Sequence, residues 1–330
     1  FHAGITPHRF DEGLDTLKDL IEAGVGSVKV FTTYSGLGLS WDQLERVFEV
    51  AASHSLTVLA HAETDSIVAA AIDAEVEAGR LAPSGHPRSR PAAAEADAIE
   101  RLGEMAGRTG AHLYVVHVSS AAGVDALRKL RREGIEVVGE TCPQYLFLDS
   151  DVYDREDGEL WICSPPIRSQ TDQAALWSGL ADGTLTVVGS DHNCFERSQK
   201  ETHRHDFREV PNGLPGVEYR LPLLVHAALM GGLDWPDVAR LAAETPARVF
   251  GLWPRKGVIA VGADADLAIV DPTAETDLGR GHMASDYSPF AHLSARGAIR
   301  QVWLRGRPIV DGGKLTVGPG YGRFLATNRG

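Results

Sequence analysis

The alternation of short apolar runs with longer helical patterns is the feature that most restricts how this chain can fold. The short runs lie at 28–31, 56–60, 113–118, 135–140 and 185–190. Helix candidates lie between them, including 11–24, which ends at Gly24, and 90–110, which has Pro91 near its start. This order is typical of βαβ units and predicts a parallel sheet.

Polar residues end or adjoin four of the expected strands, which number six when the opening FHAGI is included. These residues are Lys29, His61, His117 and Asp191. In a TIM barrel, side chains at the carboxyl ends of the strands point into one mouth, where chemistry takes place. Six strands are two short of a closed barrel.

The pattern changes after about residue 255, where short strands alternate with Gly and Asp turns in RKGVIAVGADADLAIVDP and RGAIRQVWLRGRPIVDGGK. We therefore expect a barrel at 1–254 and a portion of a small β-sandwich with a tail at 255–330. The polar stretch 196–210 is expected to be a loop.

The bulk properties exclude several classes of protein. A net charge of −13 and a pI near 5.4 disfavour nucleic acid and anionic membranes as partners and favour a small-molecule substrate. No apolar run approaches the ~20 residues of a membrane span. Three cysteines are too few for a disulfide framework, so a reducing cytoplasm is expected.

Histidine and lysine within apolar strands suggest a metal site. His61 and His117 each close an apolar strand, in VLAHAE and VVHVSS, where an imidazole needs a partner. Lys29 in SVKVF is costly to bury unless it is paired, neutralised or modified, although it could instead extend its amine out of the strand end. Asp191 follows a buried strand, and its alternative role is a helix N-cap. We expect ordinary surface or structural roles for His54, His86, His112, His226 and His292.

Seven segments occur in the order SVKVFTTY, LAHAE, LYVVHVSS, GETCPQYL, CSPPIR, GSDHN and VPNGLPGVEYR. In this order they resemble the dihydropyrimidinase and hydantoinase family of cyclic amidohydrolases, and the resemblance runs from Phe1 to the C-terminus. It implies a TIM-like (β/α)8 barrel, a homotetramer, and hydrolysis of dihydropyrimidines or 5-substituted hydantoins to N-carbamoyl amino acids.

The resemblance also implies a pair of divalent metal ions, with zinc favoured. Lys29 would be an N6-carboxylysine that bridges them. His61 and His117 would bind one ion, and Asp191 would bind the other and carry the proton to the leaving nitrogen. In this mechanism a hydroxide that bridges the metals attacks the ring carbonyl.

Three further residues match the family's substrate site. Tyr34 would stabilise the developing oxyanion, and the backbone groups of Ser164 and Asn212 would hold the ring amide. Their ordinary alternatives are a lid aromatic for Tyr34 and plain turn positions for the other two.

One family motif has no counterpart here. The family carries a His-x-His pair on its first barrel strand, and nothing upstream of Lys29 has that spacing. His203 and His205 have it, but they lie in the polar stretch after Asp191 and are not expected to reach the mouth. We therefore expect that this sequence begins at about the third barrel strand, without the first two.

Two other functions remain open from the sequence. One is an allantoinase-like hydrolase, and the other is a non-catalytic scaffold of the dihydropyrimidinase-related type. The segment PNGLPGVEYR favours a dihydropyrimidinase or hydantoinase over an allantoinase. Retention of the four candidate metal ligands argues against the non-catalytic scaffold. The apolar residues of the loop TTYSGLGLSW favour a substrate whose ring carries an apolar substituent. Alternatively, these residues only pack within the loop.

Overall fold

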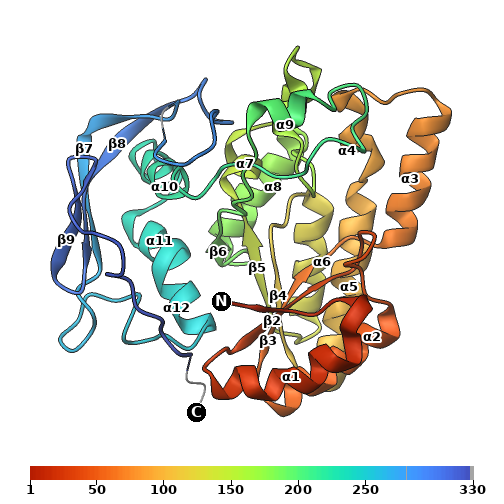
Figure 1. The fold of residues 1–330 in the computed structure, drawn as a ribbon, viewed down its shortest axis with the longest axis horizontal. Coiled ribbons are helices and arrows are strands. Elements are labelled where there is room, and N and C mark those ends of the chain that lie inside the picture. Colours follow the sequence, from red (N-terminus) through yellow and green to blue (C-terminus); the bar gives the residue numbers. More distant parts are fainter. Residues whose placement is uncertain (280, 328–330) are drawn as a thin grey trace.

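The computed structural model describes residues 1–279 and 281–327, which form a parallel sheet with helices and an antiparallel sheet (Figure 1). The parallel sheet has the order β1 (Ala3–Gly4), β2 (Ser27–Phe31), β3 (Thr57–His61), β4 (His112–Val115), β5 (Val137–Thr141) and β6 (Val187–Val188). Each predicted strand is present, and each pairs in parallel with the next. The predicted α/β class is confirmed.

Helices connect and follow these strands. They are α1 (Phe10–Glu22), α2 (Trp41–Ser53), α3 (Asp65–Glu77), α4 (His86–Ser89), α5 (Ala92–Thr109), α6 (Ala121–Arg132), α7 (Pro143–Phe147), α8 (Gln170–Ala181), α9 (Arg197–Glu201), α10 (Arg220–Leu229), α11 (Trp235–Ala239) and α12 (Thr245–Val249). Short 3₁₀ helices are η1 (Pro7–Arg9), η2 (Pro83–Gly85), η3 (Ser150–Asp154) and η4 (Gly158–Trp161), and η5 (Arg240–Glu244) is a π-helix.

Local sequence sets the helix ends. A capping box between Ser40 and Gln43 begins α2, because each side chain accepts a hydrogen bond from the other residue's backbone N–H. Gly110, with a φ of 77°, ends α5 in the left-handed conformation that glycine adopts without strain. Both helices predicted from the sequence, 11–24 and 90–110, are confirmed as α1 and α5 within a few residues.

Alternation along the strands separates two faces of the parallel sheet. Val28, Val30 and Val58 are fully buried in the main hydrophobic core. Lys29 and His61 lie on the opposite face, where Leu59 belongs to a second, smaller cluster with Tyr114, Val116 and Val187. This second face is the interior of an open barrel, since β6 does not pair with β1 among the described residues.

The C-terminal region is an antiparallel sheet of β7 (Leu267–Asp277), β8 (Ser294–Leu304), β9 (Arg307–Asp311) and β10 (Lys314–Leu315). It packs against α10 (Figure 1). The tail then returns to the first helix, where the Thr327 N–H donates to the Gly24 carbonyl at 2.9 Å. Gly24 has a φ of 89°, and a Cβ there would lie 2.4 Å from that of Ala326, so only glycine fits.

The expectation for 196–210 is wrong in one respect, because α9 lies within this stretch. Its five residues begin with a capping box between Glu196 and Gln199.

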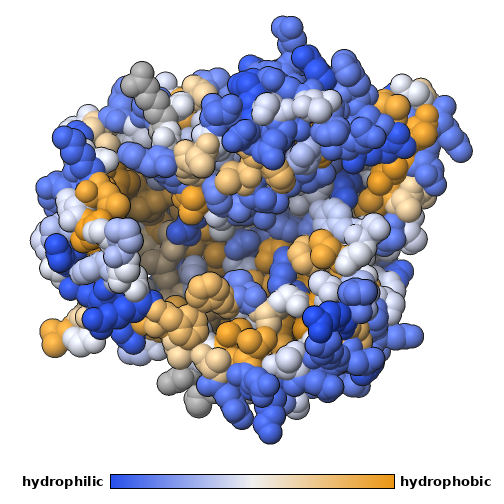
Figure 2. Space-filling model, viewed as in Figure 1, coloured by the Kyte–Doolittle hydropathy of each residue, from blue (hydrophilic) through white to orange (hydrophobic). Residues whose placement is uncertain are grey.

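On the face shown in Figure 2, hydrophobic residues gather around a hollow in the middle. In the described part of the chain, no helix is both long and apolar enough to cross a membrane.

Candidate active site

Lys29 and Asp191 influence each other inside the open barrel. Burial lowers the pKa of Lys29 to about 8, although the charges of Asp191 and Glu140 oppose this shift. Burial also raises the pKa of Asp191, and Lys29 opposes that shift. Lys29 is in the middle of β2, whereas Asp191 lies just beyond β6, so the fold brings together two groups that are far apart in sequence.

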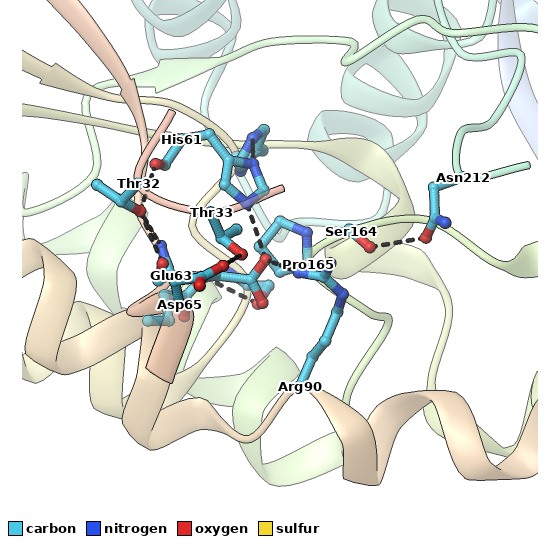
Figure 3. Close-up of polar contacts among 12 residues, drawn as sticks. Thr32, Thr33, His61, Glu63, Asp65, Arg90, Ser164, Pro165 and Asn212 are labelled. Carbon is cyan, nitrogen blue, oxygen red and sulfur yellow. Dashed lines mark hydrogen bonds and ion pairs between the residues drawn. The ribbon is translucent and has the colours of Figure 1, made fainter. Parts of the chain in front are cut away.

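His61 and His117 are in direct contact. Nδ1 of His61 lies 2.9 Å from Nε2 of His117, and Nε2 of His61 lies 2.8 Å from Oε2 of Glu63 (Figure 3). Burial would raise the pKa of Glu63, but Arg90 and His61 lower it to about 2, so Glu63 is a carboxylate that can only accept. His61 therefore donates from Nε2 to Glu63.

This assignment fixes the protons of both rings. Burial lowers the pKa of each histidine, so both are neutral. Neutral His61 then accepts at Nδ1, and His117 donates from Nε2. Nδ1 of His117 is left with a free lone pair, and this buried atom has no hydrogen-bond partner among the described residues. Such a nitrogen can bind a metal ion.

The ring of Tyr34 packs against His61. Its ring centroid is 4.8 Å from that of His61, and the guanidinium carbon of Arg90 lies 4.8 Å from the tyrosine ring centroid. The Tyr34 carbonyl accepts from the N–H of Gly38 at 2.8 Å, which closes a tight turn after β2. Burial raises the pKa of the Tyr34 hydroxyl, so it remains protonated and able to donate.

Ser164 and Asn212 form a side-chain pair beside Tyr34. The Ser164 hydroxyl donates to Oδ1 of Asn212 at 2.7 Å (Figure 3), and the Ser164 side chain acts on the pKa of the Tyr34 hydroxyl, which it lowers against the effect of burial. The seven residues chosen from the sequence thus gather in two sets. One is the lysine and aspartate pair, and the other runs from Asn212 through Ser164 and Tyr34 to the histidines.

Backbone strain concentrates at these residues. The residues other than glycine with positive φ in the described chain are Tyr34, Ser55, His117, Asp191 and Arg305. Three of them belong to the candidate site, with φ values of 83° for Tyr34 and 44° for both His117 and Asp191. A strained conformation persists only where the surrounding structure holds it, and such residues cluster at functional sites.

Three contributors were not singled out from the sequence. Glu63 forms a buried ion pair with Arg90 as well as its contact with His61. Glu140 accepts from the Tyr114 hydroxyl at 2.6 Å and from the backbone N–H of His117 at 3.2 Å. Both glutamates lie within the quoted segments LAHAE and GETCPQYL, and a carboxylate at the end of an apolar strand was the available signal.

The donor set suits a metal centre but is short of ligands. Imidazole and carboxylate are groups that divalent ions prefer, a carboxylated Lys29 would add carboxylate oxygens, and Nδ1 of His117 has no other partner among the described residues. No cluster of three or more His, Cys, Asp or Glu within 1–279 and 281–327 is arranged to hold an ion. His205 is exposed, and His203 contacts Glu209 at 3.4 Å, so neither supplies the His-x-His pair.

A separate cavity of about 700 Å³ lies at the other end of the parallel sheet. It is lined by the first residues of three strands, Thr57, His112 and Val137, and by Arg248 and Val249 of α12. None of the candidate site residues lines it. The cavity and the candidate site residues therefore lie at opposite ends of the sheet.

Comparison with known proteins gives a consistent result. Residues 8–309 match the amidohydrolase family. The D-phenylhydantoinase of Escherichia coli is 39% identical over 98% of this chain and 71% of its own length. A crystal structure of a D-hydantoinase has a TM-score of 0.93 at 33% identity, covering 96% of this chain and 71% of its own. A dihydropyrimidinase from Brevibacillus agri has a TM-score of 0.93 at 34% identity, covering 99% and 72%.

Proposed function

This chain belongs to the amidohydrolase family, and we propose that it hydrolyses the ring amide of hydantoins or dihydropyrimidines to N-carbamoyl amino acids. The observation that supports this most is the convergence of Lys29, Asp191 and the His61–His117 pair at one end of a parallel sheet. The substrates are those in the names of the relatives that it resembles.

We propose that Lys29 is an N6-carboxylysine and that, together with His61, His117 and Asp191, it would hold two divalent metal ions, which the donor types favour as zinc. Carbon dioxide reacts with the neutral amine, and burial that lowers the pKa of Lys29 to about 8 increases the neutral fraction near neutral pH. When bound, the ions would supply an activated water and polarise the ring carbonyl.

The chain's own residues would handle the ring and the proton. Ser164 and Asn212 orient the ring amide, and the protonated Tyr34 hydroxyl donates to the oxygen on which negative charge develops. The oxygen of water bonds to the ring carbonyl carbon, and the carbon–nitrogen bond breaks. Asp191, whose pKa burial raises, takes the proton from water and passes it to the leaving nitrogen.

The test compares turnover of hydantoin, dihydrouracil and allantoin by the full chain purified after growth with zinc and bicarbonate. We expect ring opening of hydantoin or dihydrouracil, followed by the appearance of the N-carbamoyl product. Cleavage of allantoin alone would assign the chain to the allantoinase-like alternative. Turnover of none of the three by metal-loaded protein would favour the scaffold alternative.

Three organisational features are also proposals. We infer a functional division into 1–254 and 255–330, a cytoplasmic location and a homotetramer. The separate antiparallel sheet supports the division, and the free cysteines Cys142, Cys163 and Cys194 are compatible with a reducing compartment. Light scattering measures the assembly, and a mass other than four chains would contradict the tetramer.

A further inference from the structure

Lys200 is a fully buried lysine in a stretch that is otherwise polar and largely exposed. Its relative exposure is 0%, although its neighbours Thr202 and Arg204 on the same stretch are exposed. Lysine is almost never buried to this degree unless its amine has specific partners. The position therefore calls for a physical reason.

The amine of Lys200 joins two loops by hydrogen bonds. Nζ donates to the Ile162 carbonyl at 2.7 Å and to the Pro211 carbonyl at 2.9 Å. Ile162 lies two residues before Ser164, and Pro211 immediately precedes Asn212. Lys200 thus contacts both loops that carry the candidate amide-binding pair.

Two other hydrogen bonds connect the same loops. The Gly213 N–H donates to the Ile162 carbonyl at 3.1 Å, and the Ser164 hydroxyl donates to Asn212 at 2.7 Å. His86 adds a bond from Nε2 to the Cys163 carbonyl at 2.8 Å. The amine of Lys200 and the serine–asparagine pair therefore both join the loop that carries Ser164 to the loop that carries Asn212.

The charge state of Lys200 agrees with a hydrogen-bonding role. Within the described part of the chain Lys200 forms no ion pair, and Cys163, Glu159 and the ring of Phe195 are the groups around it. Burial lowers the pKa of Lys200 to about 7. A neutral amine still carries two N–H groups, one for each carbonyl, so both bonds survive deprotonation.

We propose that Lys200 is a positioning residue that fixes the Ser164 and Asn212 loops relative to each other and thereby aligns the ring amide. This inference rests on the proposed function, because it takes these loops as the substrate-binding pair. Lys200 touches none of the candidate metal ligands, so its effect is on substrate alignment and not on metal content.

The test uses Lys200→Met, which keeps most of the side-chain volume and removes the donors. We expect KM to rise about tenfold with a smaller change in kcat, because the loops hold the ring before and during reaction. Metal content should equal that of the wild type. Lys18→Met, at an exposed position of α1, is the matched control and should leave both constants unchanged.

Hydrogen exchange provides a second readout that does not depend on catalysis. The Gly213 amide, which donates to the Ile162 carbonyl, should exchange faster in Lys200→Met, while amides of β3 should not change. Lys200→Gln keeps two N–H donors on a shorter side chain and should recover part of both effects. It also replaces the methionine variant if that variant does not fold.

The outcomes separate the two proposals. Faster Gly213 exchange together with a higher KM supports the positioning role. A folded Lys200→Met protein with wild-type exchange and wild-type KM overturns it. If the wild type cleaves no cyclic amide, the proposed function fails, and the exchange measurement alone decides whether Lys200 fixes the two loops.

Discussion

The two ends of the parallel sheet differ in kind. At the carboxyl end, polar groups such as His61, Glu63 and His117 are buried and contact one another, and the backbone is strained at His117 and Asp191. At the amino end, a cavity of about 700 Å³ opens between strand starts such as Val137 and the helix residue Val249. Grouped polar residues whose pKa values are shifted by burial and by one another mark the carboxyl end as the place of the candidate chemistry.

The largest effect should come from Asp191→Asn at the carboxyl end. The amide cannot carry a proton between water and the leaving nitrogen, so kcat/KM should fall by about a thousandfold or more. Steady-state kinetics on hydantoin or dihydrouracil measures this loss. Asp15→Asn, on the exposed side of α1, is the control, and an equal loss in both variants would remove the proposed role.

Tyr34→Phe should have the next largest effect on catalysis. Removing one donor to a developing oxyanion lowers kcat by about a hundredfold. The phenyl ring keeps the packing against His61 and Arg90, so the melting temperature should change little. Tyr321→Phe, in the C-terminal tail, is the matched control, and wild-type kcat in Tyr34→Phe would leave Tyr34 as a lid aromatic.

Glu63→Gln tests the buried ion pair between Glu63 and Arg90 at the carboxyl end, and the effect is measured as a change in the free energy of unfolding. Arg90 would lose its carboxylate partner inside the protein, which costs about 3 kcal/mol in the free energy of unfolding. Chemical denaturation measures this change. Glu12→Gln removes the partner of Arg9 in an exposed pair and should cost under about 1 kcal/mol. Equal costs in the two variants would contradict the contrast.

The same carboxylate predicts a pH dependence. The folded-state pKa of Glu63 is about 2, below its ordinary value of 4.5. Its contribution to stability is therefore fully present above about pH 4.5 and is lost as the pH falls toward 2. Unfolding measured across this range should show a smaller decline for Glu63→Gln than for the wild type, and parallel curves would disagree with the assignment.

The smallest effect is expected at the amino end of the sheet. His112 is exposed and lines the cavity there. His112→Ala should leave kcat/KM within about twofold and stability within about 0.5 kcal/mol, as is usual for surface substitutions. A large loss of activity would move the chemistry to the cavity.

The sequence predicted what depends on local periodicity. Each strand of the parallel sheet appeared as a short apolar run, because buried strands must be apolar, and His61 closes β3 as expected. His117 and Asp191 instead lie beyond the ends of β4 and β6, in strained backbone that no residue pattern announces. Element boundaries depend on tertiary hydrogen bonds, so these positions could be predicted only approximately.

What the sequence missed depends on long-range contacts. Glu63 and Arg90 are 27 residues apart, and nothing in either neighbourhood indicates that they form a buried pair. Lys200 lies in a stretch whose composition indicates a solvated loop, yet its amine reaches carbonyls at Ile162 and Pro211. Burial of a single polar side chain is decided by what packs over it, and that information is absent from the local sequence.

The proposed metal centre is tested most directly by the metal content per chain, measured by elemental analysis on wild-type protein and Lys29→Ala grown with zinc and bicarbonate. We expect two divalent ions per chain in the wild type and a clear loss in Lys29→Ala, because a carboxylated Lys29 would supply ligand oxygens to both ions. No bound ion in the wild type, or equal content in both proteins, would contradict a metal centre built on Lys29.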